Sequence, residues 1–488
     1  MSEGPSPPRP VRWRDLLIIA ATAALAAAWQ IDRKPIWLDE AVSWDMASRP
    51  PADLAAKTAA DIHPPLYYLV LSVWAGAFGD SLTGLRSLSA VATMGSAVLL
   101  YLLARRWLAR GTAVFAAVAY AISPHTIYFA QEARMYALAA LLVLAATVSY
   151  RRWLESGGTR TADLIAYGIT AAAAMYTHYA TALALAAIAA HLVFVFRPGR
   201  PTVLRWVAAN LGAALIYLPW MPTAAAQIFR GQAWRQAVTL ADLPGYAVEA
   251  VFQLEFGLYQ FPHFGLWPYA FVAALAAAAI YGIVLALRRT AASTREQDWF
   301  LVLMVVAPLV LALFAQLRSG YLSLPRYLAY LLPFVVLLLA RGLTTAFRPA
   351  AGAAAIVALA GLQLPALRHY YAQPTRDYDP APVIEFLQAR LAESADPARE
   401  RIIFAPGYMH LMFKYYWRDL QSDGVSQPAE LDQFLLSRHT AGRLWVVEDY
   451  RWVHGHGGVT HPGLAPVAIP GADKARVRVF TQEGREGP

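Results

Sequence analysis

Two adjacent carboxylates are the residues of this sequence best placed for acid–base chemistry. Asp39 and Glu40 follow Trp37-Leu38, a few residues beyond an apolar stretch from Leu16 to Trp29 that is long enough to enter a bilayer. An ionisable side chain in such surroundings is costly and is by default a functional candidate. The pair therefore predicts acid–base chemistry at a membrane surface.

Further polar and aromatic strings interrupt the apolar blocks. They are His63-Pro64-Pro65-Leu66-Tyr67-Tyr68, Gln131-Glu132-Ala133-Arg134-Met135-Tyr136, Tyr176-Thr177-His178-Tyr179 and Pro325-Arg326-Tyr327. Structural interpretations stay open, because tyrosines and arginines are common at membrane interfaces and a histidine can cap a helix. Arg134 has the alternative of an intramembrane ion pair with Glu132, although residues two apart on a helix do not face each other directly.

The composition defines the class of protein that carries these residues. Of the 488 residues, 58% are hydrophobic and only 15% are charged, and the mean hydropathy is +0.40. This chain is too apolar for a soluble globule and indicates a polytopic membrane protein built from α-helices. The sequence has no cysteine, which excludes disulfides and thiolate metal sites.

The arginines set the expected orientation. The net charge of +9 comes largely from arginines in short turns between apolar blocks, as the positive-inside rule would place them, and not from a basic patch with interleaved aromatics. We therefore expect no nucleic-acid partner.

The same arginines predict the topology of the chain. Residues 1–15 are expected to form a cytoplasmic tail, and Leu16–Gln30 a retained first helix. Ten further spans are expected near 85–104, 113–129, 132–150, 161–178, 179–196, 206–222, 266–287, 299–317, 327–345 and 350–366, which makes about eleven in residues 16–366.

Three segments are expected outside these spans, on the side opposite the N-terminus. The first external loop covers 31–82 and contains an interfacial or re-entrant helix at Pro64–Gly79, because its apolar block is short for a span. A long external loop covers 223–265. Residues 367–488 form a small external α/β domain, with strand-like runs at 401–404 and 444–447 and a helical pattern at 383–391. Under this topology the polar strings collect on the external face.

The order of these motifs resembles a known family. Leu38-Asp39-Glu40-Ala41, the His63 string, Leu85-Arg86-Ser87-Leu88-Ser89-Ala90, the Gln131 string and Pro325-Arg326-Tyr327-Leu328 occur in that order. This series is similar to the bacterial branch of the protein-O-mannosyltransferase-like glycosyltransferases. These belong to the C-type superfamily, as do the lipid A aminoarabinose transferases. The resemblance implies an all-α polytopic membrane domain of the C-type glycosyltransferase fold.

The resemblance also implies a reaction. Such enzymes transfer a sugar from a polyprenyl-phosphate donor to a hydroxyl of an acceptor glycan, lipid or protein by direct displacement with inversion. By similarity Asp39 is the general base, and Glu40 orients it or binds the acceptor. Arg134 and Arg326 oppose the charge on the leaving lipid phosphate, and His63 is a further donor or an acceptor-binding group. Glu132, Tyr327 and Tyr67 complete the expected substrate-binding set.

Several alternatives stay open. No cofactor is expected to be required, but a divalent metal held by His63 with Asp39, Glu40 or Asp61 is an alternative. A flippase of lipid-linked sugars and a lipid-pyrophosphate-dependent glycan polymerase or ligase are the competing functions. The expected location is the bacterial inner membrane, with many passes, a cytoplasmic N-terminus and a periplasmic C-terminal domain. The sugar, the acceptor and the polyprenol length do not follow from the sequence.

Overall fold

Two compact units make up the chain in the computed structural model. The first contains residues 1–31 and 49–372, and the second contains residues 32–48 and 373–488. The structure describes residues 11–230, 236–256, 292–320, 322–347, 349–425, 430, 443–449, 465–472 and 477–482, together with isolated positions between 273 and 288. The predicted span 266–287 and parts of the loop 223–265 lie largely outside the described residues.

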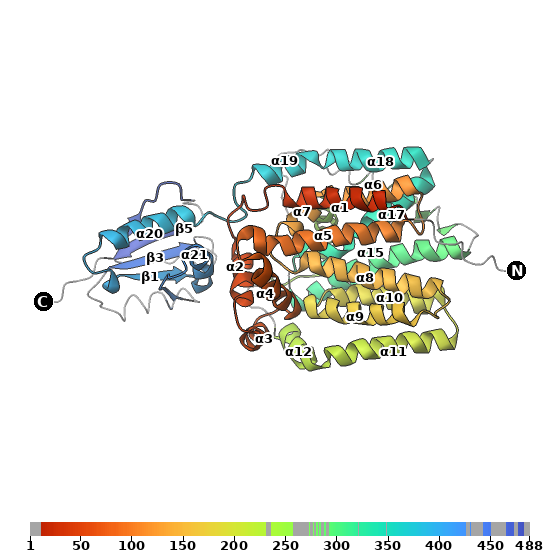
Figure 1. Ribbon diagram of the computed structural model, residues 1–488, viewed down its shortest axis with the longest axis horizontal. Helices are drawn as coiled ribbons and strands as arrows, with labels where there is room; N and C mark the ends of the chain where they lie inside the picture. The colour runs from red at the N-terminus through yellow and green to blue at the C-terminus, as the bar shows by residue number, and fades with distance from the viewer. Residues whose placement is uncertain are drawn as a thin grey trace. The chain divides into compact units, whose positions relative to one another are not determined.

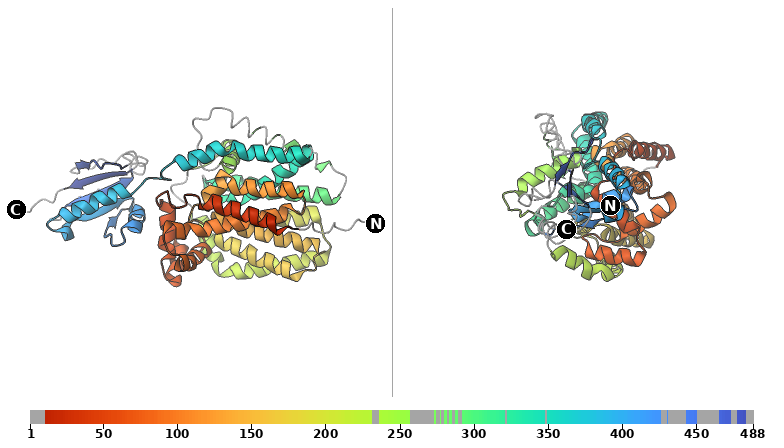
Figure 2. Two further views of the ribbon diagram at one scale, coloured as in Figure 1. Left: turned by 45° about the horizontal axis from the view of Figure 1, so that its top comes forward. Right: turned by 90° about the vertical axis from the view of Figure 1, so that its left-hand side faces the viewer.

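The first unit is helical. Figures 1 and 2 show most of its long helices running side by side. Its elements are α1 (Trp13–Ala28), α3 (Pro51–Ala60), α4 (Leu66–Phe78), α5 (Leu82–Ala104), α6 (Arg110–Ile122), α7 (Pro124–Ala130), α8 (Tyr136–Glu155), α9 (Thr161–Thr177), α10 (Thr181–Ala190), the π-helix η1 (His191–Phe196), α11 (Arg200–Tyr217), η2 (Leu218–Trp220), α12 (Met221–Phe229), α13 (Leu243–Phe256), α15 (Ala292–Ser319), α16 (Leu324–Tyr327), η3 (Ala329–Leu331), α17 (Leu332–Ala346), α18 (Pro349–Leu362) and α19 (Leu364–Ala372).

Apolar helices of membrane-spanning length confirm a multi-pass membrane protein. Among the described residues, five helices have the length and composition to cross a membrane, and a sixth is obtained if α6 and α7, bent by 57°, form one span. The five are Leu82–Ala104, Tyr136–Glu155, Arg200–Ile228, Arg295–Ser319 and Ala329–Ala346. The predicted number of about eleven is not confirmed, because several of the expected spans are shorter helices.

The short helix α4 starts and ends where the sequence analysis placed the interfacial or re-entrant helix. Pro64 and Pro65 precede it, because proline is tolerated at a helix start but not inside. Gly79 ends it with φ 83°, a left-handed conformation that favours glycine. Ser81 then caps α5 by accepting a hydrogen bond from the Gly84 N–H at 3.1 Å.

The bend after α6 changes the expected setting of Arg134. The sequence analysis placed Arg134 at the start of a span beginning near residue 132. In the structure α7 ends at Ala130, residues 131–135 form a turn, and α8 begins at Tyr136. The argument that Glu132 and Arg134 are two apart on a helix therefore does not apply, because neither residue is helical.

Ion pairs join the helices at the other end of the bundle. Each links a basic residue of one helix or turn to a carboxylate of another, and together they tie α1, α6, α8, α9, α15 and α17. The pairs are Arg110 with Asp15, Arg106 with Glu155, Arg151 with Glu296, Arg152 with Asp163 and Arg341 with Asp298.

The second unit is built on a small mixed sheet. Its elements are α2 (Leu38–Ala47), α20 (Ala381–Glu393), η4 (Pro397–Arg399), β1 (Arg401–Ala405), η5 (Gly407–Met409), α21 (His410–Tyr416), β2 (Asp423–Gly424), β3 (Leu444–Asp449), β4 (Ala465–Val467) and β5 (Val477–Gln482). The strand order is β2-β1-β3-β5-β4. β1 is parallel to β2 and β3, whereas β5 is antiparallel to β3 and β4.

Helices α20 and α21 contact one face of this sheet. Phe386 of α20 lies 5.6 Å from the ring of Trp445, and Phe413 of α21 lies 4.7 Å from the ring of Phe404. The register pairs Ile402 with Trp445 and Phe404 with Val447, so these side chains share a face by strand alternation. Helix α2 packs against α21 in the same unit.

Candidate active site

A cavity of about 420 Å³ opens in the helical unit where the loop before α4, the α9–α10 junction, α12, α15 and α16 meet. His63 and Pro64 come from the loop before α4, His178 from the junction of α9 and α10, Arg318 from the end of α15, and Tyr327 from α16. Residues far apart in the sequence thus line one space, whose wall is mainly apolar and carries a few polar side chains. This combination is the usual form of a ligand site.

His178 lies at the centre of the aromatic wall of this cavity. Its ring centroid is 5.3 Å from Tyr327, 5.8 Å from Tyr136 and 6.4 Å from His63. His178 ends α9, and its backbone N–H donates to the Ala174 carbonyl at 2.9 Å. The Tyr330 hydroxyl donates to the Ala180 carbonyl at 2.7 Å, which ties the segment after α16 to the same junction.

His63 and Arg134 form the polar side of the site. His63 Nδ1 lies 3.2 Å from Asp61 Oδ2, and its Nε2 lies 3.5 Å from Arg134 Nη2. Arg134 also donates from Nη1 to the Tyr68 hydroxyl at 3.3 Å. Burial raises the pKa of Asp61, but the hydrogen bond and positive charge of His63 outweigh it, and the net effect lowers the pKa below its ordinary value.

The turn that carries Arg134 is held by neighbours on three sides. Gln131 Nε2 donates to the carbonyls of Ala27 and Trp29 at 3.0 and 2.7 Å, and the Tyr370 hydroxyl donates to Gln131 Oε1 at 2.7 Å. Ser89 Oγ donates to the Glu132 carbonyl at 2.6 Å. Gln131, Glu132 and Arg134 are all buried. These contacts hold the turn in place, so the charge of the Arg134 guanidinium is preorganised for a ligand.

Arg326 lies in α16 beside Tyr327, a residue of the cavity wall. The Tyr327 ring lies 5.3 Å from the ring of His178, which lies 5.8 Å from the ring of Tyr136. Arg326 and Tyr327 are half-buried and lie in the single turn α16, where Pro325 sits near the start. The tertiary structure thus places Arg326 next to a residue of the cavity wall, and Arg134 next to another, His63. Tyr67 is fully buried in α4, and its ring packs on that of Tyr68 at 5.6 Å.

Asp39 and Glu40 lie in the first turn of α2, in the other compact unit. Carboxylates there interact favourably with the positive end of the helix dipole. Glu40 is fully buried and Asp39 is half-buried. Ser43 Oγ donates to the Asp39 carbonyl at 3.1 Å within the helix.

Sequence reasoning missed two residues that line the cavity. Arg318 is exposed at the end of α15 and has no carboxylate partner within the part of the chain that the structure describes. Gln227 of α12 donates from Nε2 to the Thr58 carbonyl at 2.7 Å and accepts from the Tyr179 hydroxyl. The sequence did carry a signal for Arg318, because this arginine ends an apolar block on the side opposite the basic turns.

The donors for a divalent metal are incomplete in the helical unit. Asp61 and His63 are one of the pairs considered from the sequence, and their side chains do lie together. In the described ranges, however, no group of three or more His, Asp or Glu side chains is arranged to hold a metal ion.

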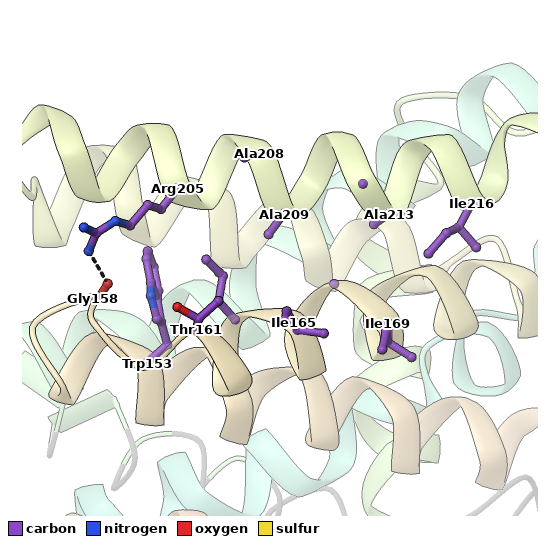
Figure 3. A pocket seen from close by; sticks show the side chains of 13 residues that line it. Trp153, Gly158, Thr161, Ile165, Ile169, Arg205, Ala208, Ala209, Ala213 and Ile216 are labelled. Carbon is purple, nitrogen blue, oxygen red and sulfur yellow. Dashed lines mark hydrogen bonds between the residues drawn. The ribbon is translucent and has the colours of Figure 1, made fainter.

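A second cavity, of about 400 Å³, lies between α9 and α11 and has a different character. Figure 3 shows Ile165, Ile169, Ala209 and other small or apolar side chains facing each other across the two helices. Arg205 donates from Nη1 to the Gly158 carbonyl at 2.9 Å. Among the described residues that line it, Thr161 and Arg205 carry polar groups but none is a carboxylate or a histidine, so the cavity at His63 is the better candidate for acid–base chemistry.

Part of the chain is similar to a family of known proteins. Residues 62–225 match the family model described as dolichyl-phosphate-mannose-protein mannosyltransferase. Comparison with curated proteins gave no match. The crystal structure of the Archaeoglobus fulgidus oligosaccharyltransferase in the apo form is similar, with 14% identity over 90% of this chain and 69% of that chain and a TM-score of 0.55.

The apo crystal structure of ArnT from Cupriavidus metallidurans aligns over 97% of this chain and 98% of that chain, with 12% identity and a TM-score of 0.48. ArnT has also been crystallised bound to undecaprenyl phosphate, and that structure aligns over 97% of this chain and 99% of that chain with 13% identity and a TM-score of 0.48.

Residues 62–225 thus resemble a family of membrane mannosyltransferases, and the fold of the chain is similar to that of the Archaeoglobus fulgidus oligosaccharyltransferase. Within that class, the chain is similar to the protein-O-mannosyltransferase-like enzymes, and the resemblance read from its motifs is confirmed.

Proposed function

We propose that this chain transfers a sugar from a polyprenyl-phosphate donor to a hydroxyl acceptor. The observation that carries the proposal is the cavity lined by His63, His178 and Tyr327, with Arg134 Nη2 3.5 Å from His63 Nε2 and Arg326 next to Tyr327 in α16. Guanidinium groups bind phosphate through paired hydrogen bonds and keep their charge when buried. The family model that matches residues 62–225 is described by a lipid-phosphate sugar donor, which supports the same class of substrate.

The proposed step is a direct displacement. The acceptor oxygen attacks the anomeric carbon of the donor sugar, Asp39 takes the hydroxyl proton, and the bond between that carbon and the phosphate oxygen breaks. Polyprenyl phosphate leaves with the bonding electron pair, and the configuration at the anomeric carbon inverts. Glu40 orients Asp39 or binds the acceptor.

The arginines act on the leaving group. Negative charge builds on the phosphate oxygen as the glycosidic bond breaks, and fixed cations in a site of low dielectric stabilise it. Arg134 is buried and held by Tyr68 and His63, so its charge is in place before the reaction starts. Arg318, at the cavity wall, is a third cation for the same phosphate.

The reaction is proposed for a bacterial inner membrane, with the N-terminus in the cytoplasm and the C-terminal domain and the site in the periplasm. The arginines near the N-terminus favour this orientation.

Transfer of labelled sugar from purified polyprenyl-phosphate-sugar by Asp39→Asn tests the proposal. Loss of a general base lowers the rate by about 10²–10⁴-fold. Asp45→Asn is the matched control, because Asp45 is another half-buried carboxylate of α2 and is not assigned a role. Unchanged transfer by Asp39→Asn, or an equal loss in both variants, removes Asp39 as the base. Absence of transfer by the wild type with any lipid-phosphate sugar, together with movement of the donor between leaflets, supports a flippase instead.

A further inference from the structure

A third cavity, of about 470 Å³, is bordered by two arginines and lies at the far end of α15 from the candidate active site. It is bounded by the end of η1 and the first turns of α15, which pack together within the helical unit. Arg295 borders this cavity and Arg318 borders the other one. At a rise of about 1.5 Å per residue, roughly 34 Å of helix separates the two arginines. The two cavities therefore cannot serve one small ligand.

The backbone beside the cavity has an unusual conformation. Residues His191–Phe196 form a π-helix, a form that is rare and is found frequently at functional sites. Arg197, which follows it, adopts a left-handed conformation with φ 49° and ψ 57°. Its Nε donates to the Phe194 carbonyl at 2.9 Å. The chain thus turns sharply in a way that brings the Arg197 side chain to the cavity wall.

The charge of the cavity is positive, because its one acid is already neutralised. Glu296 accepts from Arg151 Nη2 at 3.1 Å through Oε2, and its Oε1 lies 2.6 Å from His191 Nε2. Arg197 and Arg295 have no carboxylate partner among the residues that the structure describes. Both belong to turns or helix starts rich in arginine, as expected at a membrane boundary.

The remaining wall is apolar and faces outward. Phe194, Trp299 and Leu303 border the same cavity. Phe194 is 68% exposed and Trp299 is 39% exposed, although both are large and hydrophobic. In a membrane protein such surfaces contact lipid tails, and tryptophan is typical of the headgroup level. The cavity therefore combines an apolar surface with Arg197 and Arg295, which have no carboxylate partner in the described part of the chain.

We propose that this cavity binds the headgroup of an anionic phospholipid, with its phosphate between Arg197 and Arg295 and its acyl chains along Phe194 and Leu303. Basic pockets between transmembrane helices are a known form of lipid-headgroup site. The site is independent of the sugar donor, since it stands on other residues at the opposite end of α15.

Titration of the purified full-length protein in detergent, followed by native mass spectrometry, tests this inference. The probes are phosphatidylglycerol, phosphatidylcholine and inorganic phosphate. We expect phosphatidylglycerol to bind more tightly than phosphatidylcholine. Arg295→Gln should weaken phosphatidylglycerol binding about fivefold, and Arg197→Gln with Arg295→Gln about 25-fold, because each basic residue near an anionic headgroup contributes by a similar amount.

Arg160→Gln is the matched control, because Arg160 is an exposed arginine just before α9 and does not line the cavity. It should leave binding unchanged, and Arg197→Lys should retain most of it because the charge stays. Equal loss in Arg160→Gln and Arg295→Gln, no preference over phosphatidylcholine, or equally tight binding of inorganic phosphate each overturn the proposal. Arg295→Gln keeps the test decisive if the double variant does not fold, because Arg295 is exposed. Sugar transfer is not the readout, so failure here leaves the proposed function untouched.

Discussion

The ring of Trp44 meets the ring of Tyr415 edge to face, with the two centroids 5.5 Å apart. The Arg418 guanidinium lies 4.4 Å from the Trp44 centroid, and the Ile36 N–H donates to the Tyr416 hydroxyl at 2.9 Å. These contacts join α2 to the segment around α21 in the second unit. The helix that carries Asp39 and Glu40 is thus packed on the C-terminal domain, for which sequence analysis assigned no role. We therefore propose that this domain holds α2, and with it Asp39, in a fixed position.

Replacing Trp44 with alanine should destabilise this unit. Trp44 is 6% exposed, and truncation of a buried large aromatic side chain to alanine costs about 3–5 kcal/mol. We expect a lower unfolding temperature and a loss of sugar transfer. Trp44→Phe, which keeps an aromatic ring against Tyr415, should restore most of both. Thermal unfolding and a transfer assay make the comparison, and wild-type values for Trp44→Ala would mean that α2 does not depend on this packing.

Arg134 should affect transfer far more than its hydrogen-bond partner does. Arg134→Ala removes a buried charge proposed to stabilise the leaving phosphate, so kcat should fall about 10²–10³-fold. Tyr68→Phe removes the hydroxyl that accepts from Arg134 at 3.3 Å and should cost about fivefold. Arg134→Lys keeps the charge but loses the paired geometry, and should fall between them.

The control for Arg134 is Arg160→Ala at the other end of the bundle. Steady-state kinetics with a saturating lipid donor measure the effect. An Arg134→Ala enzyme that folds, as judged by its unfolding temperature, and transfers sugar at the wild-type rate would contradict the assignment.

Asp61 should stabilise the fold in a pH-dependent way. The folded-state pKa of Asp61 lies below its ordinary value of 3.8, because the contact with His63 outweighs burial. The ionised form is therefore favoured by folding, so the stabilisation is present above pH 3.8 and is lost as the pH falls through the lower folded-state pKa. Unfolding temperatures of wild type and Asp61→Asn should differ most at pH 7 and converge toward pH 2.5. A constant difference over this range would show that the carboxylate charge is not the cause.

Gly84 and Gly76 should respond oppositely to the same substitution. A Cβ at Gly84 would lie 2.2 Å from the Gly79 carbonyl oxygen, so Gly84→Ala must move backbone. We expect a loss of about 1–3 kcal/mol in the free energy of unfolding. A Cβ at Gly76 meets nothing within 4 Å, and alanine is the better helix former by about 0.5–1 kcal/mol. Denaturant unfolding of both variants measures the contrast, and equal effects would contradict it.

Several local features were predictable because they depend on neighbouring residues. The apolar blocks predicted helices, the two prolines before Leu66 and the glycine after Phe78 marked the limits of α4, and the alternating runs near 401 and 444 became strands β1 and β3. The placement of Arg134 at a helix start was wrong, because the bend between α6 and α7 and the contacts of Gln131 impose a turn that no local pattern announces.

The sequence by itself determined the class of protein, because hydropathy and charge act residue by residue and the family motifs are short and ordered. Only the tertiary structure decided which of the polar residues meet. His63, Arg134, His178 and Tyr327 converge because α4, α8, α9 and α16 end at one place, and such convergence arises from packing between helices distant in the chain. The grouping of α2 with the C-terminal domain and the cationic cavity at Arg197 and Arg295 have the same origin. Contacts of this kind depend on long-range packing, and a single sequence does not record it.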